Sequence, residues 1–175
     1  MSHHVRRLAR SAKAALAVYP RAVLAVDGRT GAGKSTLAQV LASHLRAAGH
    51  HVDILPLDLL AYGWDDLAGA VHAGARLTSA FRALGEARYR PYDWERGRPA
   101  ERDITVAGDL LIVEGCGALS ATLAPLIDDG VIVRASRDTR EARITARDHY
   151  DWSAERRAWE EQHDALTYPP SVRRP

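Results

Sequence analysis

Short apolar runs alternate along the chain with longer stretches in which apolar residues recur three and four positions apart. A continuous apolar run is typical of a buried strand, and the longer spacing is typical of an amphipathic helix. The predicted strands cover residues 22–26, 51–57, 110–113 and 131–135, and the predicted helices cover residues 5–18, 35–48, 65–84 and 137–149. Because alternating strands and helices assemble into parallel sheets, the pattern predicts an α/β fold with a mainly parallel sheet.

Residues 85–109 fit neither period, since proline and glycine interrupt them and charged residues alternate with aromatic ones. We expect an irregular connection, and its length favours a functional role. Within it, Tyr92 and Trp94 could stack on a planar ligand while Asp93, Arg90 or Arg96 hydrogen-bonds to that ligand. The alternative is that Trp94 only packs over the predicted helix 65–84.

Length and composition predict one globular domain over residues 1–175, with a core at 22–163, an N-terminal helix within 1–20 and a strandless tail at 168–175. Hydrophobic residues make up 46% of the chain, and no apolar run is long enough to cross a bilayer. The single cysteine, Cys116, cannot form an internal disulfide, which favours a reducing cytoplasm. The net charge of +2 is too small to predict a nucleic-acid partner.

A glycine-rich turn follows the first predicted strand and fits the phosphate-binding pattern G-x-x-x-x-G-K-[ST] at every fixed position. Glycines bring backbone N–H groups around a phosphate, and the following helix directs its positive end at the same anion. Lys34 would reach the β- and γ-phosphate oxygens, and the Ser35 hydroxyl would bind Mg²⁺. The predicted nucleotide-binding residues are Gly28, Arg29, Thr30, Gly31, Ala32, Gly33, Lys34, Ser35 and Thr36.

Two acidic residues come directly after predicted strands. Asp58 follows the second strand, and Glu114 follows the third in Val113-Glu114-Gly115. In an open α/β sheet the carboxyl ends of the strands border the ligand crevice, so both carboxylates are candidates for catalysis or substrate binding. Either residue could instead cap a helix or be solvated.

Four arginines lie three, three and four positions apart in the last predicted helix and would form one positive stripe: Arg137, Arg140, Arg143 and Arg147. The plain interpretation is a solvated helix with ion pairs. The alternative is a lid, because a stripe without acids on its own face needs a counter-charge such as a bound triphosphate.

Five stretches together resemble the uridine kinase-like branch of the P-loop small-molecule kinases. They are residues 27–36, the segment Leu57-Asp58 followed by Tyr62-Gly63-Trp64-Asp65, residues 89–94, residues 113–115, and residues 143–148. The resemblance implies a three-layer P-loop NTPase fold with an arginine-bearing lid helix, and the use of ATP and Mg²⁺.

The same resemblance implies roles for particular residues. Asp58 would be the general base for the acceptor hydroxyl, and Glu114 would hold the acceptor or the magnesium water shell. Arg143 and Arg147 would bind phosphates. Tyr62 would join Tyr92, Asp93 and Trp94 in the substrate-binding set.

The function that these observations favour is phosphoryl transfer from ATP to a hydroxyl of a small acceptor, for instance a nucleoside, and a homo-oligomer stays open. A regulatory P-loop ATPase without a small-molecule acceptor is the alternative. A GTPase is disfavoured because the chain contains no Asn-Lys-x-Asp guanine-binding sequence. A nucleic-acid end kinase has only the arginine-rich segments in its favour.

Overall fold

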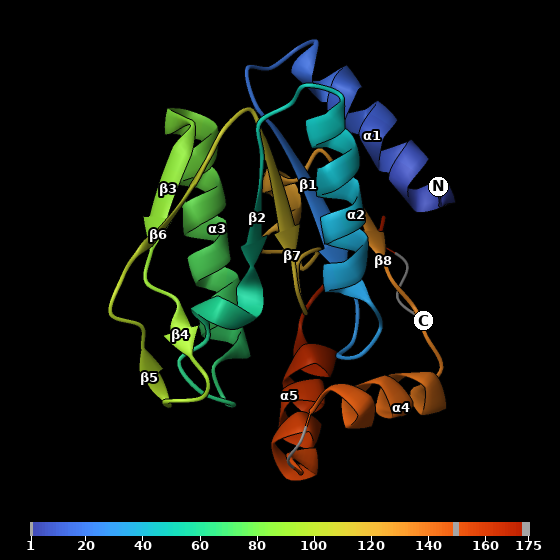
Figure 1. The fold of residues 1–175 in the computed structure, drawn as a ribbon, viewed down its shortest axis with the longest axis vertical. Coiled ribbons are helices and arrows are strands. Elements are labelled where there is room, and N and C mark those ends of the chain that lie inside the picture. The colour runs from blue at the N-terminus through green and yellow to red at the C-terminus, as the bar shows by residue number, and fades with distance from the viewer. Residues whose placement is uncertain (1, 149–150, 173–175) are drawn as a thin grey trace.

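The computed structural model describes residues 2–148 and 151–172. Its centre is a sheet of four parallel strands in the order β2-β7-β1-β8 (Figure 1). These strands are β1 (Ala22–Asp27), β2 (Val52–Pro56), β7 (Leu110–Glu114) and β8 (Asp129–Ile132). The observed β8 begins two residues before the predicted strand. The parallel α/β sheet expected from the alternating pattern is confirmed.

Helices cover both faces of the sheet because its central strands carry apolar side chains on both sides. Val23 and Ala25 of β1 belong to the core shared with α3 (Leu67–Leu84). Their neighbour Leu24 belongs to the core shared with α1 (His3–Leu16) and α2 (Lys34–Ala47). Side chains of a strand point alternately to its two faces, so these two cores define three layers. The predicted three-layer arrangement is confirmed.

The region 85–109 contains four short strands, so the prediction of an irregular connection was wrong. β3 (Glu86–Tyr89) pairs antiparallel with β6 (Ile104–Ala107), and β4 (Tyr92–Asp93) pairs with β5 (Arg98–Pro99). The pairing of β3 with β6 joins segments on either side of the β4-β5 hairpin. Single short strands have weak local preferences, and their pairing depends on the tertiary structure.

Two helices lie beyond the carboxyl ends of the parallel strands, at the end of the molecule that also carries the β4-β5 hairpin (Figure 1). They are α4 (Arg137–Arg147) and α5 (Ser153–Ala165). The pattern analysis assigned no element to α5, and the predicted end of α4 at residue 149 lies outside the described residues. No strand occurs within residues 168–172, the described part of the predicted tail. Within the described ranges, no helix has the length and apolar character that a membrane span needs.

Candidate functional site

The glycine-rich turn between β1 and α2 has a backbone that only glycine allows at two positions. Gly28 has φ +143°, and a Cβ atom there would lie 2.3 Å from the carbonyl oxygen of Val133. Gly31 has φ +77°, and a Cβ atom there would lie 2.8 Å from the carbonyl oxygen of Arg140. α2 begins at Lys34 directly after the turn, so backbone N–H groups and the positive helix end converge on one spot. This arrangement fits a bound phosphate.

The buried carboxylate of Asp27 anchors the start of the turn. Its Oδ1 accepts hydrogen bonds from the backbone N–H groups of Gly28, at 2.5 Å, and Gly117, at 3.1 Å. Its Oδ2 accepts from the N–H of Leu119, at 2.8 Å, and from the hydroxyl of Tyr168, at 3.0 Å. Burial acts to raise the pKa of Asp27, but hydrogen bonds and the nearby His163 outweigh burial, so this pKa lies below its ordinary value. Asp27 is therefore ionised and structural.

Lys34 and Ser35 face the ends of the sheet strands. The Lys34 ammonium donates to the carbonyl oxygen of Arg29 at 3.1 Å and lies 3.7 Å from the Cys116 sulfur. The Ser35 hydroxyl donates to Oε1 of Glu114 at 3.0 Å. A hydroxyl beside a carboxylate offers the hard oxygen ligands that Mg²⁺ prefers, so Ser35 fits a magnesium bound directly and Glu114 fits its water shell.

A cavity of about 560 Å³ opens between the turn, the strand ends and α4. The sequence-predicted residues that line it are Thr30, Gly31, Gly33, Lys34, Ser35, Thr36, Asp58, Trp94, Glu114, Arg143 and Arg147. These side chains come from parts of the chain that are far apart in sequence. One cavity therefore gathers the predicted phosphate-binding turn, both candidate carboxylates and two arginines of the stripe.

Asp58 and Glu114 both have raised pKa values. Asp58 opens onto the cavity, yet the protein atoms around it displace water, and this desolvation raises the pKa of its carboxyl group against the opposing effect of Lys34. Burial also raises the pKa of Glu114, and the negative charge of Asp58 adds to this effect. A carboxylate with a raised pKa is a better proton acceptor, which suits Asp58 to act as a general base.

All four tryptophans of the chain line the same cavity, and we call them the indole wall: Trp64, Trp94, Trp152 and Trp159. Trp64 lies at the centre of the indole wall, with its ring centroid 4.4 Å from that of Trp94 and 4.9 Å from that of Trp152. The Nε1 atom of Trp94 donates to the carbonyl oxygen of Asp58 at 3.1 Å. The indole wall therefore borders the candidate base.

Three predicted substrate-binding residues do not line this cavity. Tyr62 is 54% exposed, and its ring lies edge-on to that of Tyr92 at 5.8 Å between centroids. Asp93 accepts hydrogen bonds from the N–H groups of Glu95 and Arg96, at 3.1 and 3.0 Å, and so closes the β4-β5 turn. A substrate role for these three residues stays a prediction.

Sequence reasoning left Trp64, Trp152 and Trp159 out of the site. Trp64 lies inside one of the motifs that carry the family resemblance, which was the available signal. Trp152 and Trp159 are seven positions apart, a spacing that places them on one face of a helix. This spacing would have indicated a shared face only if the sequence had first predicted a helix in the region of α5.

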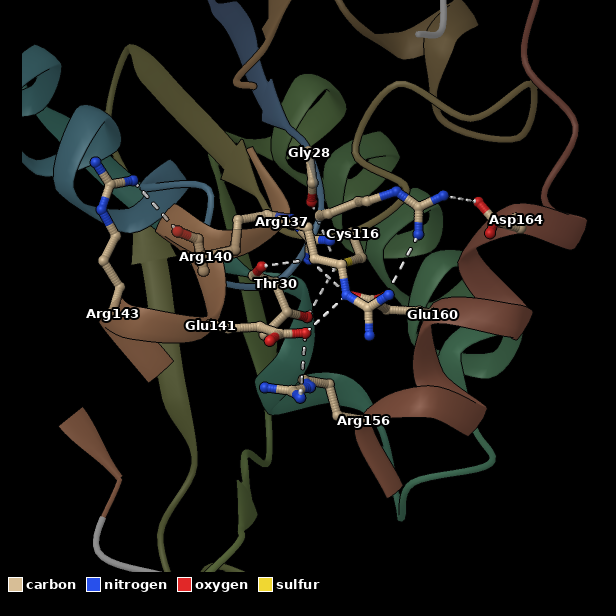
Figure 2. A network of polar contacts seen from close by, with 12 residues as sticks. Gly28, Thr30, Cys116, Arg137, Arg140, Glu141, Arg143, Arg156, Glu160 and Asp164 are labelled. Atoms are coloured by element: carbon tan, nitrogen blue, oxygen red, sulfur yellow. Dashed lines mark hydrogen bonds and ion pairs between the residues drawn. The ribbon is translucent and has the colours of Figure 1, made fainter. Parts of the chain in front are cut away.

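Ion pairs connect the turn to α4 and α5 (Figure 2). Arg140 of α4 is buried, and its Nη1 donates to the carbonyl oxygen of Thr30 at 3.1 Å and to Oε1 of Glu160 at 2.5 Å. Arg29 of the turn pairs with Asp164 of α5 and lies 3.6 Å from Glu160. These contacts hold the turn against both helices.

The arginine stripe has acidic partners, which agrees with the interpretation of a helix with ion pairs. Arg137 pairs with Glu141 one turn along α4, with Nε to Oε1 at 2.9 Å, and Arg140 pairs with Glu160 from the unpredicted helix α5. Arg147 pairs with Asp148. Arg143 donates instead to backbone carbonyl oxygens of the turn, Gly31 at 3.3 Å and Ala32 at 3.1 Å. Arg143 is therefore well placed to meet a phosphate held by the turn.

A second cavity of about 450 Å³ lies on the β8 side of the same turn. Gly28, Arg29 and Ala32 of the turn border it, and residues 132–135, which include the end of β8 and the start of the following connection, form another side. Arg140, His163, Asp164 and Tyr168 complete its lining together with Asp27. The glycine-rich turn thus lies between two cavities.

No known protein family and no curated protein matches the chain. Several solved structures match the chain. A candidate fructose transport system kinase from Silicibacter sp. TM1040 matches with a TM-score of 0.77 and 21% identity over 100% of both chains. A possible uridine kinase from Bacillus stearothermophilus matches with a TM-score of 0.61 and 21% identity over 94% of this chain and 97% of that one. The chain has the fold of these kinases. Both likenesses agree with the resemblance drawn from the sequence motifs.

If the turn holds nucleotide phosphates, Lys34→Ala should bind ATP far more weakly while keeping its thermal midpoint, because only the cation is removed. Calorimetric titration with ATP and Mg²⁺ measures this affinity. Lys13→Ala changes the other lysine, which is exposed on α1, and should bind ATP as the wild type does. Equal ATP affinity in the two variants would reject the assignment of the turn.

Proposed function

We propose that the protein is a small-molecule kinase that transfers a phosphoryl group from ATP, with Mg²⁺, to a hydroxyl of a nucleoside or a similar small acceptor. The observation that carries the proposal is the single cavity in which Asp58 faces the glycine-rich turn, Lys34 and the pair Ser35-Glu114. A regulatory ATPase needs the turn but does not need a carboxylate base beside an aromatic wall.

In the proposed reaction, the turn and nearby cationic side chains bind the phosphate groups of ATP. Backbone N–H groups of the turn and the Lys34 ammonium stabilise the charge on the β- and γ-phosphates. Arg143 and Arg147 of α4 border the same cavity and would neutralise the charge on the transferring group. Mg²⁺ would be held by the Ser35 hydroxyl, with Glu114 holding its water shell, and would supply further positive charge to the phosphates.

The acceptor end of the reaction depends on Asp58. Its carboxylate takes the proton from the acceptor hydroxyl as the hydroxyl oxygen forms a bond to the γ-phosphorus. The bond between that phosphorus and the bridging oxygen breaks, its electron pair stays on ADP, and the phosphorylated acceptor is formed. The raised pKa of Asp58 strengthens it as a proton acceptor in this step.

The acceptor subsite is bordered by the indole wall. Aromatic rings favour flat or apolar faces of a ligand, and one such stacking contact is worth about 1–3 kcal/mol. One structural neighbour is a possible uridine kinase and another a candidate fructose transport system kinase, and both of these names imply hydroxylated acceptors. A nucleoside combines a flat base with sugar hydroxyls and suits this subsite best.

The acceptor requirement is tested with a panel of nucleosides, nucleoside monophosphates and sugars, assayed for ADP formation with ATP and Mg²⁺. We expect at least one nucleoside to raise ADP formation well above the rate without acceptor. The reverse result, a steady ATPase rate that no member of the panel changes, would favour the regulatory ATPase.

We further propose that the second cavity receives the nucleotide base, because it borders the same turn on the side away from Asp58. Ala135→Trp would fill part of this cavity. ATP should then bind about ten-fold more weakly, since a stacking contact of the base is lost. Tripolyphosphate, which has no base, should bind equally to the variant and the wild type in calorimetric titrations. A parallel loss for both ligands would mean that the substitution disturbs the turn and not a base site.

Asp58→Asn keeps the size of the side chain but removes the proton acceptor, so kcat should fall about 10²-fold or more with ATP affinity retained.

The pH dependence of the wild-type rate provides a second test of the role of Asp58. The base acts when ionised, and its pKa is raised from the ordinary 3.8, so activity should fall with decreasing pH on a limb that lies above 3.8. Stopped assays across pH measure both effects. A kcat near the wild-type value in Asp58→Asn would assign the base to another residue.

A further inference from the structure

Asp148 joins an arginine of α4 to the indole wall. It is the residue directly after α4 and lines the large cavity. Its Oδ1 accepts from Nε of Arg147 at 2.6 Å, and its Oδ2 accepts from Nη2 of the same guanidinium at 2.9 Å. The same Oδ2 accepts from the indole Nε1 of Trp152 at 2.7 Å. One carboxylate thus bridges a candidate phosphate ligand and an aromatic side chain.

Trp152 connects this bridge to the segment that follows Asp58. It is buried at the start of α5 and stacks on Trp64, with 4.9 Å between ring centroids and 25° between ring planes. Gln162 of α5 reinforces the connection, because its amide donates to the carbonyl oxygen of Trp64 at 2.7 Å and accepts from the N–H of Leu67 at 3.1 Å. These hydrogen bonds therefore tie α5 to the segment that carries Trp64.

The bridge matters because Arg147 is exposed and long. An arginine side chain has many rotamers, and a bidentate carboxylate restricts the orientation of its planar guanidinium. A guanidinium held in one orientation loses less entropy when it binds a phosphate. A ligand that packs against Trp64 and Trp152 contacts the indole that hydrogen-bonds to Asp148 and the ring stacked on that indole.

We infer that Asp148 is a positioning residue that couples the acceptor side of the cavity to Arg147. An acceptor that contacts Trp64 and Trp152 keeps the indole N–H of Trp152 hydrogen-bonded to Asp148. Asp148 in turn keeps the guanidinium of Arg147 directed at the phosphoryl group. The inference rests on the proposed function, because that function gives Arg147 its role as a phosphate ligand. It assigns roles to Asp148, Trp64 and Trp152, which lie outside the glycine-rich motif.

A double-mutant cycle tests the coupling by kinetics. Trp152→Phe keeps a ring against Trp64 but removes the N–H donor, and Asp148→Asn removes the charge that holds Arg147. Each should lower kcat about ten-fold, the typical effect of a hydrogen bond to a charged group, with KM for ATP nearly unchanged. The double variant should be no slower than the slower single variant, because both substitutions break the same bridge.

The matched control is Glu141→Gln, an acid-to-amide change on α4 that breaks an exposed ion pair with Arg137 outside the cavity. It should leave kcat within about two-fold of the wild type, as expected for a surface pair. Thermal midpoints identify variants that fail to fold, and Trp152→Phe and Asp148→Asn test the bridge from its two ends. Losses that multiply in the double variant, or an Asp148→Asn enzyme that behaves like Glu141→Gln, would overturn the inference.

A second measurement separates the coupling from the proposed function. The indole N–H signals in a ¹⁵N spectrum report on each tryptophan, and Trp152→Phe assigns the signal of Trp152 by its loss. A non-hydrolysable ATP analogue with Mg²⁺ should shift this signal in the wild type and in Glu141→Gln, and should leave it in place in Asp148→Asn.

The two measurements have distinct outcomes. If the shift occurs but no acceptor in the panel stimulates ADP formation, the proposed kinase function fails and the bridge stands. If an acceptor is phosphorylated but the Trp152 signal shifts equally in Asp148→Asn and the wild type, the kinase function stands and the coupling is wrong.

Discussion

The carboxylate of Asp27 is the interaction on which the site depends. It lies at the end of the central strand β1, with 1% of its surface exposed, and holds three parts of the chain at once. They are the first residue of the glycine-rich turn, the loop at residues 117–119, and Tyr168 after α5. A buried charge is costly unless hydrogen bonds compensate it, so loss of these donors would leave an unpaired charge in the core. The turn, the strand ends and the C-terminal segment are therefore positioned together.

The arginines around the turn differ in how far neighbouring carboxylates compensate their positive charge. Arg29 and Arg140 are paired with carboxylates of α5, and these pairs serve to fasten α4 and α5 to the turn. The hydrogen bonds of Arg143 found within the described residues go to neutral carbonyl oxygens. Its positive charge is thus less compensated, and a bound phosphate would offer it a stronger partner. Within the stripe, Arg140 therefore has a structural contact with α5, and Arg143 is the arginine whose charge is open to a ligand.

The cavity combines two environments that suit the two ends of phosphoryl transfer. Cations and N–H groups gather at the turn, where negative charge would develop in the proposed reaction, and aromatic rings gather beside Asp58, where a neutral acceptor would lie. The carboxylates of Asp58 and Glu114 line the same cavity, and partial desolvation by the surrounding protein atoms raises their pKa values. A site of this kind acts mainly through positioning and electrostatics, which is the general requirement of phosphoryl transfer.

Local sequence determined the parallel sheet, α1 to α3, the turn and the two acids at the strand ends. Each of these depends on neighbours in sequence: a buried strand needs a continuous apolar run, and the turn needs glycines at fixed spacing. The tertiary structure decided the rest. β3 pairs with β6 across an intervening hairpin, Arg140 pairs with an acid on α5, and four tryptophans from three separate segments meet in one wall. Such contacts join residues distant along the chain, and their geometry is set by the packing of whole elements, which no local pattern of residues encodes.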